Sequence, residues 1–191
     1  MILRPHFFWG VQNADAPPRM NVFLVGPMGS GKSAVGRQLA QRLALEFIDS
    51  DAEIEARTGV DIAYIFEREG EAGFRSREAE VIDALSRRDR VLVSTGGGAI
   101  LDASTRERLR ARGRVVYLQA SVDQQLARTR RSNDRPLLNN DDPRGTLERL
   151  FEQRAPLYTE VAEIVVDTDG RKVKAVVDQI CHQLGIDGVE P

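Results

Sequence analysis

Short apolar runs alternate with amphipathic stretches along most of the chain. The apolar runs predict strands over residues 22–25, 46–48, 91–95, 114–118 and 163–166. The amphipathic stretches repeat their apolar positions with a helical period and predict helices over about residues 32–45, 71–88, 102–112, 121–130, 143–154 and 171–184. Continuous runs rich in β-branched residues are typical of strands covered on both faces. The sequence therefore predicts an α/β fold, a three-layer sandwich in which a five-stranded parallel sheet is flanked by helices.

Local signals place the starts of three helices and one long loop. Helix starts are indicated by Asp102, Ser121 and Asp142, because such side chains accept hydrogen bonds from the first free backbone N–H groups of a helix. Residues 131–142 contain many turn formers and little periodicity. We interpret residues 130–140 as a mobile lid.

The two ends of the chain differ from this pattern. Phe7-Phe8-Trp9 belongs to an apolar N-terminal stretch, but the residues before it interrupt the continuous hydrophobic region that a signal peptide needs. We expect residues 1–19 to form a flexible extension, residues 20–184 the folded domain and residues 185–191 a tail. Met20 is an alternative start of the domain.

The composition is that of a soluble globular protein, with 41% hydrophobic and 29% charged residues among 191. The net charge of −2 argues against general nucleic-acid binding, and no apolar run is long enough to span a bilayer. The single cysteine, Cys181, cannot form an internal disulfide, which suits the reducing cytoplasm. Two histidines at opposite ends of the chain make a zinc site unexpected. We expect a cytoplasmic protein, and nothing here demands more than a monomer.

The strongest motif follows the first predicted strand. Residues Gly26–Ser33 read Gly-Pro-Met-Gly-Ser-Gly-Lys-Ser and match the spacing G-x-x-x-x-G-K-[ST]. A glycine-rich turn that opens a helix directs backbone N–H groups and the positive end of the helix dipole at one point, where a polyphosphate can bind. Lys32 would reach the β- and γ-phosphates, and the Ser33 hydroxyl would bind Mg²⁺. The alternative is an ordinary glycine-rich turn.

Two carboxylates follow the second predicted strand. In an extended chain, Asp49 and Asp51 would point to the same side, toward the ligand cleft at the carboxyl ends of the strands. One carboxylate can hold Mg²⁺ through a water, and the other can accept a hydrogen bond from an attacking hydroxyl group. The alternative is that either residue caps the next helix.

Three successive glycines follow the third predicted strand. Gly96, Gly97 and Gly98 expose bare backbone N–H groups and let a substrate lie against the chain. A flexible connection from strand to helix would also use glycine. The position at the carboxyl end of a strand favours a ligand site.

Residues 66–78 read as a helix end, a glycine break and a new helix with a buried stripe that includes Phe74. Arg75 lies beside this stripe, and Glu78 lies one helical turn farther on. The glutamate could fix the guanidinium so that it presents its two-pronged donor face to a ligand carboxylate. The alternative is an ion pair in solvent.

Four arginines surround the predicted lid, namely Arg128, Arg130, Arg131 and Arg135. Arginines brought in on closure would neutralise charge on transferring phosphates. The alternative is a solvated basic loop. Arg154, near a helix end, could supply a second clamp for an anion.

Taken together, these motifs resemble those of shikimate kinases, small members of the nucleoside-monophosphate-kinase group of P-loop proteins. The resemblance covers about residues 20–184 and includes Arg135-Pro136-Leu137-Leu138 and Arg154-Ala155-Pro156-Leu157-Tyr158. It implies ATP- and Mg²⁺-dependent phosphorylation of the 3-hydroxyl of shikimate, a step in chorismate and aromatic amino-acid biosynthesis. Shikimate and ATP are then the expected partners, with no nucleic acid and no membrane.

The resemblance also implies a role for each matching residue. The implied catalytic residues are Lys32, Asp51 and Arg135. Shikimate would contact Asp51, Arg75, Gly97, Gly98 and Arg154. ATP would contact Gly29, Ser30, Gly31, Lys32, Ser33, Ala34, Arg128 and Arg135, and the adenine would lie near residues 167–169. Mg²⁺ would be held by Ser33 and Asp49.

Two other functions stay open at this point. One is another small-molecule kinase of the same fold, such as a gluconate or nucleotide kinase. The other is an ATP-binding regulator without catalysis. Retention of Lys32, Ser33, Asp49, Asp51 and Arg135 in one chain argues against the regulator.

Overall fold

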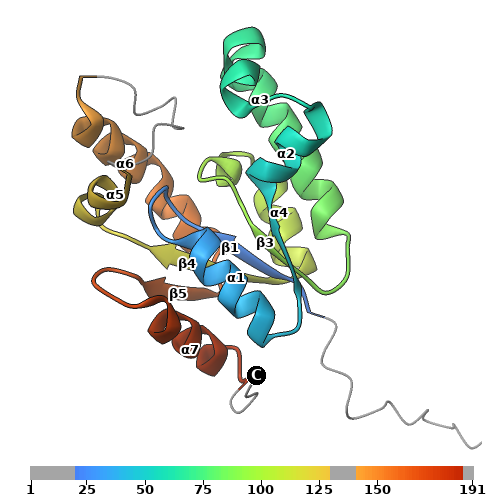
Figure 1. Ribbon diagram of the computed structural model, residues 1–191, viewed down its shortest axis with the longest axis vertical. Helices are drawn as coiled ribbons and strands as arrows, with labels where there is room; N and C mark the ends of the chain where they lie inside the picture. Colours follow the sequence, from blue (N-terminus) through green and yellow to red (C-terminus); the bar gives the residue numbers. More distant parts are fainter. Residues whose placement is uncertain (1–19, 130–140, 187–191) are drawn as a thin grey trace, which may run out of the picture.

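The computed structural model describes residues 20–129 and 141–186 (Figure 1). Its centre is a parallel sheet with the strand order β2-β3-β1-β4-β5. The strands are β1 (Val22–Val25), β2 (Glu46–Asp49), β3 (Val91–Ser94), β4 (Arg114–Gln119) and β5 (Ile164–Asp167). Each strand begins and ends within one residue of its predicted range. The five-stranded parallel sheet is therefore confirmed.

The helices include all six that the sequence predicts and one that it does not. They are α1 (Lys32–Arg42), α2 (Ser50–Thr58), α3 (Ile62–Ser86), α4 (Ala103–Arg112), α5 (Val122–Thr129), α6 (Pro143–Val161) and α7 (Val173–Gln183), with a short 3₁₀ turn η1 (Ala99–Leu101). Asp102, Ser121 and Asp142 accept backbone hydrogen bonds at the starts of α4, α5 and α6, as predicted. In the described part of the chain, no helix has the length and apolar character needed to cross a membrane.

The helices cover both faces of the sheet and complete the three layers. One core cluster joins the sheet to α2, α3, α4 and α6, and a second joins it to α1 and α7. Figure 1 shows α1 and α7 side by side on one face. Alternate residues of β1 enter opposite clusters, Phe23 and Val25 on one side, Val22 and Leu24 on the other. This double burial explains the continuous apolar runs.

Two helices depart from their predicted ranges. The helix α3 begins at Ile62, because Asp61 caps it by accepting from the Tyr64 N–H at 2.7 Å. The predicted break lies at Gly70, whose φ of 69° and ψ of −177° are not helical. The helix α6 continues to Val161 although Pro156 lies inside it. Buried side chains beyond the proline, including Tyr158, hold this last part of α6 against the sheet.

The segment predicted as the lid, residues 130–140, lies outside the described residues, and so do Arg130, Arg131 and Arg135. The carboxyl ends of β1, β2 and β3 lie at one edge of the sheet, since all the strands run parallel. The segments that follow these strands carry most of the predicted site residues.

Candidate active site

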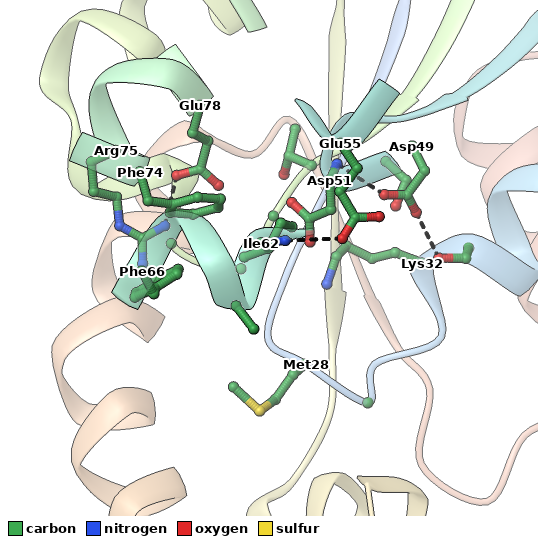
Figure 2. A pocket seen from close by; sticks show the side chains of 18 of the residues that line it. Met28, Lys32, Asp49, Asp51, Glu55, Ile62, Phe66, Phe74, Arg75 and Glu78 are labelled. Carbon is green, nitrogen blue, oxygen red and sulfur yellow. Dashed lines mark hydrogen bonds and ion pairs between the residues drawn. The ribbon is translucent and has the colours of Figure 1, made fainter. Parts of the chain in front are cut away.

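The carboxyl ends of these strands open into a cavity of about 770 Å³ (Figure 2). Figure 2 shows Lys32 and Asp49 on one side of it, Arg75 and Glu78 on the other, and Asp51 between them. The predicted residues that line the cavity are Gly29, Gly31, Lys32, Ser33, Ala34, Asp49, Asp51, Arg75, Gly97, Gly98, Arg128 and Arg154. Residues far apart in the sequence thus meet in one pocket.

The loop between β1 and α1 has the backbone of a phosphate-binding turn. Gly29 and Gly31 have φ values of 75° and 93°, a region that side chains disfavour. A Cβ on Gly26 would lie 2.5 Å from the carbonyl oxygen of Leu118. Ser30 does not line the cavity; its side chain is buried beneath the loop. The first turn of α1 therefore opens directly onto the cavity.

Lys32 belongs to this first turn and bonds to its own loop. Its Nζ donates to the carbonyl oxygens of Gly26 at 2.7 Å and Pro27 at 2.8 Å. The ammonium group is thus held over the glycine-rich turn. A positive charge at this point attracts a phosphate bound by the loop.

Arg128 connects the loop to the segment after β5. It donates to the carbonyl oxygens of Gly29 at 2.9 Å and Thr168 at 3.1 Å. The guanidinium also lines the cavity. One side chain therefore supports the loop and contributes positive charge to the same end of the pocket.

Ser33 and Asp49 form a hydrogen-bonded pair of oxygen-bearing side chains at the cavity. The Ser33 hydroxyl donates to Asp49 Oδ2 at 2.9 Å, and Asp49 Oδ1 accepts from the Asp51 N–H at 3.1 Å. The second contact caps α2, so Asp49 combines the cap and the cleft-facing role that the sequence left as alternatives. No group of three or more histidine, cysteine or acidic side chains suited to a metal occurs among residues 20–129 and 141–186. A cation here would need further oxygens from phosphate and water.

Asp51 lies in the first turn of α2, so the predicted extended chain through both carboxylates is wrong. The helix starts one residue after Asp49 and turns Asp51 into the cavity instead. Its Oδ1 is buried and has no partner within the described chain. Burial raises the pKa of the Asp51 carboxyl above its usual value, and the Asp49 charge raises it further; Lys32 and Arg75 oppose this only in part. The group is therefore a stronger base than an exposed aspartate.

Arg75 is fixed from two sides by glutamates of its own helix. Its Nη1 donates to Glu78 Oε2 at 2.7 Å, and its Nη2 donates to Glu71 Oε1 at 3.0 Å. Glu78 is only 1% exposed, so this is not an ion pair in solvent. Burial raises the pKa of the Glu78 carboxyl, while Arg75 and Arg154 act in the opposite direction. The predicted pinning of Arg75 by Glu78 is confirmed.

Arg154 is a second guanidinium in the same pocket. It is 5% exposed, and its Nε has no hydrogen-bond partner among the described residues. Burying a cation without a full set of partners is costly unless a ligand supplies them. Both guanidinium groups line the cavity, so an anion can lie within reach of both.

Two of the three glycines, Gly96 and Gly98, make room for these side chains. A Cβ on Gly96 would lie 2.2 Å from Glu78 Oε1 and 2.8 Å from Asp51 Oδ1. A Cβ on Gly98 would lie 2.3 Å from the Arg75 guanidinium. At Gly96 and Gly98, glycine is thus required by close approach rather than by flexibility alone, whereas a Cβ on Gly97 would meet nothing closer than 3.5 Å.

A family model described as shikimate kinase matches residues 28–185. The chain belongs to the shikimate kinase family. Similar shikimate kinases include those of Shewanella amazonensis and Alteromonas mediterranea. They are 55% and 54% identical to this chain. The alignments span 87% and 88% of this chain and 98% of each relative.

Solved shikimate kinases share the fold. The enzyme from Acinetobacter baumannii, in complex with shikimate, has a TM-score of 0.87 and 45% identity over 91% of this chain and 97% of its own. The enzyme from Aquifex aeolicus has a TM-score of 0.76 and 36% identity over 87% and 96%. A gluconokinase from Sinorhizobium meliloti, at 20% identity and a TM-score of 0.54, shares the fold alone.

The pocket also contains residues that were not predicted from the sequence. Phe66 and Phe74 pack with ring centroids 4.8 Å apart and form an apolar wall. Glu55 lines the cavity and accepts from the Ile62 N–H at 3.1 Å, which joins α2 to α3. The sequence did contain an indication for Phe74, because it belongs to the buried apolar stripe of α3. Glu55 gave no signal, because α2 itself was not predicted.

Proposed function

We propose that this pocket transfers the γ-phosphoryl group of ATP to the 3-hydroxyl of shikimate and gives shikimate 3-phosphate, with the residue roles described below. One observation carries the proposal: the glycine-rich loop and the guanidinium groups of Arg75 and Arg154 open into one cavity, and Asp51 lies between Lys32 and Arg75 in it (Figure 2). This arrangement holds an acceptor that combines a carboxylate with a reactive hydroxyl. The shikimate bound by the relative from A. baumannii has this chemistry.

The donor side binds the triphosphate. The N–H groups of the loop and the start of α1 cradle the phosphates, and Lys32 offsets the charge on the β- and γ-phosphates. Arg128 contributes further positive charge at this end. We assign to Arg135 the contact with the transferred phosphoryl group, on the resemblance of its motif alone.

We further propose that Ser33 and Asp49 hold Mg²⁺. Their side-chain oxygens lie 2.9 Å apart and belong to the ligand class that Mg²⁺ prefers. When bound, the metal would supply charge neutralisation on the β- and γ-phosphates. Asp49 is kept in place by its contact with the Asp51 N–H.

The acceptor side binds and orients shikimate. Arg75 and Arg154 hold the carboxylate by charge-assisted hydrogen bonds, which fix its orientation as well as its position. Asp51 then accepts a hydrogen bond from the 3-hydroxyl and takes its proton as the hydroxyl oxygen bonds to the γ-phosphorus. The bond from that phosphorus to the β,γ-bridging oxygen breaks in the same step, and ADP leaves. Alignment of this hydroxyl with the γ-phosphorus accounts for most of the catalysis.

A comparison of acceptors tests the function. With ATP and Mg²⁺ in excess, we expect turnover with shikimate and at most trace turnover with gluconate or nucleoside monophosphates. The variant Lys32→Met is the control for contaminating kinases, and its turnover should fall by orders of magnitude. Turnover with another acceptor but none with shikimate would refute the proposal. ATP binding without product from any acceptor would support the regulator instead.

We also propose that the protein acts as a monomer in the cytoplasm. The groups that line the described part of the cavity on both its donor and its acceptor side belong to this one chain, which supports the proposal. Sedimentation of the full chain at assay concentration tests this state. A dimer with activity that depends on protein concentration would contradict it.

A further inference from the structure

Tyr158 connects two parts of the site that must stay aligned for the reaction, and no role has been assigned to it above. It lies one helical turn after Arg154 on α6 and is 1% exposed. Its hydroxyl donates to the carbonyl oxygen of Gly97 at 2.5 Å, across 61 residues of sequence. Its ring stacks on Tyr117 with centroids 4.9 Å apart, which fixes the direction of the hydroxyl.

The carbonyl that Tyr158 holds belongs to a special peptide. The Ala99 N–H bonds to the Gly96 carbonyl at 3.2 Å, so residues 96–99 form a β-turn. Its central peptide joins Gly97 to Gly98. In a β-turn this peptide can rotate by about half a turn and convert type I into type II while the outer bond persists.

Side chains normally decide between the two turn types, but here both corners are glycine. Gly98 has φ −99° and ψ −6°, the values of the third residue in a type I turn. Type II needs a positive φ at this position, which glycine adopts without penalty. The backbone alone therefore does not select the observed turn.

The direction of this peptide decides what the pocket presents. The peptide is planar and trans, so the Gly98 N–H points opposite to the Gly97 carbonyl. The carbonyl points to Tyr158, and the N–H therefore points away from it. In the described part of the chain, no acceptor takes the N–H of Gly97 or Gly98, and both residues line the cavity. A flipped peptide would present a carbonyl where a donor now lies.

We infer that Tyr158 is a positioning residue: its hydroxyl locks the Gly97–Gly98 peptide in the type I orientation, in which the Gly98 N–H is available to a ring substituent of the acceptor. Burial raises the pKa of Tyr158 far above the neutral range, so the hydroxyl stays a donor at every working pH. The inference rests on the proposed function, because the acceptor is taken to be shikimate.

The chain offers a matched control in the stacking partner. Tyr117 is as deeply buried, and its hydroxyl has no hydrogen-bond partner among the described residues. Tyr158→Phe and Tyr117→Phe each remove one hydroxyl from the same stacked pair and keep both rings. They differ in whether the lost hydroxyl bonded to the Gly97 carbonyl and to the side chain of Arg154, and an Arg154→Ala background separates these two contacts.

Steady-state kinetics distinguish the two variants. We expect Tyr158→Phe to raise the KM for shikimate about tenfold, while its KM for ATP and both KM values of Tyr117→Phe stay within about twofold of wild type. Equal KM values for shikimate in the two variants would overturn the inference. Wild type that does not phosphorylate shikimate would instead refute the proposed function, so the two failures differ.

Two further measurements separate a lock on the turn from general loosening. In ¹⁵N spectra, we expect exchange broadening of the Gly98 amide in Tyr158→Phe and a sharp signal in Tyr117→Phe. In an Arg154→Ala background, Tyr158→Phe should produce the same fold increase in KM, because the hydroxyl acts on Gly97. A sharp Gly98 signal in Tyr158→Phe, or loss of the effect when Arg154 is absent, would overturn the assignment.

Discussion

Replacement of Arg154 by methionine should separate ligand binding from protein stability. Methionine keeps most of the length and apolar contact of the arginine but lacks the guanidinium. Arg154 is 5% exposed, and its Nε has no partner in the described chain. The change therefore removes a buried cation that the protein itself satisfies only in part.

The expected effect on binding follows from a charge-assisted contact with the shikimate carboxylate. Such contacts contribute about 1.5–3 kcal/mol, so the KM for shikimate should rise about 10- to 150-fold. The free energy of unfolding should change little, within about 1 kcal/mol. Loss of the burial cost of the cation offsets the lost attraction to Glu78.

Initial rates against shikimate concentration give the KM, and urea unfolding gives the free energy of unfolding. Arg114→Met is the matched control, because Arg114 pairs with Glu163 at the surface and lies outside the cavity. Its KM should equal that of wild type. An unchanged KM in Arg154→Met would exclude Arg154 from the clamp. A loss of several kcal/mol in stability would show that the arginine is structural.

Three further results are expected. Asp51→Asn should lower turnover at least 100-fold with little change in the KM for ATP. The turnover of the control Asp61→Asn, at the rim of the cavity, should stay near that of wild type. Near-normal turnover of Asp51→Asn would exclude Asp51 as the base. Because the pKa of Asp51 is raised in the folded protein, its ionised form destabilises the fold, and stability present at low pH is lost as pH rises through the folded-state pKa. The melting temperature of Asp51→Asn should therefore exceed that of wild type near pH 8, and the difference should vanish toward pH 4. A difference that does not change with pH would contradict the burial argument. In Gly98→Ala the new Cβ would lie 2.3 Å from the Arg75 guanidinium and displace it. The KM for shikimate should then rise about as much as it does in Arg75→Ala. An unaltered KM would show that Arg75 can move aside without loss of shikimate binding.

The fold was predictable because the apolar runs that form the strands are its strongest sequence pattern. The strands β1 and β3 and the middle of β4 are apolar and buried on both faces, so no polar residue interrupts these runs. The edge strands β2 and β5 are only partly buried, but each keeps a short apolar run. The helix α2 was missed for the opposite reason. Ile54 is its one deeply buried apolar side chain, so no helical period is visible in residues 50–58.

The site was predictable where spacing along the chain encodes geometry. The loop before α1 and the pair Arg75 and Glu78 lie within one or two turns of backbone, so local rules place them. Asp49 shows the limit of such rules. Its cap on α2 and its contact with Ser33 were alternatives in the sequence, and the structure satisfies both with its two carboxylate oxygens.

Long-range contacts could not be read from the sequence. Tyr158 belongs to a segment already matched to the family, yet its hydroxyl meets a carbonyl 61 residues away. Gly96 is required because Glu78 and Asp51, from two different helices, approach the same point of its backbone. Only the packing of α2, α3 and α6 around the turn reveals why glycine and tyrosine occupy these positions.

Three of the six buried side-chain atoms that lack a partner in the described part of the chain lie at the site. Among the described residues, buried side-chain atoms without a partner include Asp51 Oδ1, Glu78 Oε1 and Arg154 Nε, all on residues that line the cavity. In a protein interior, such atoms normally find partners, because leaving them bare costs free energy. Here they belong to acids and bases that a ligand with hydroxyl and carboxylate groups can satisfy. The fold thus accepts local destabilisation in order to keep these groups ready for the acceptor, and the apolar clusters on both faces of the sheet supply the stability that offsets it.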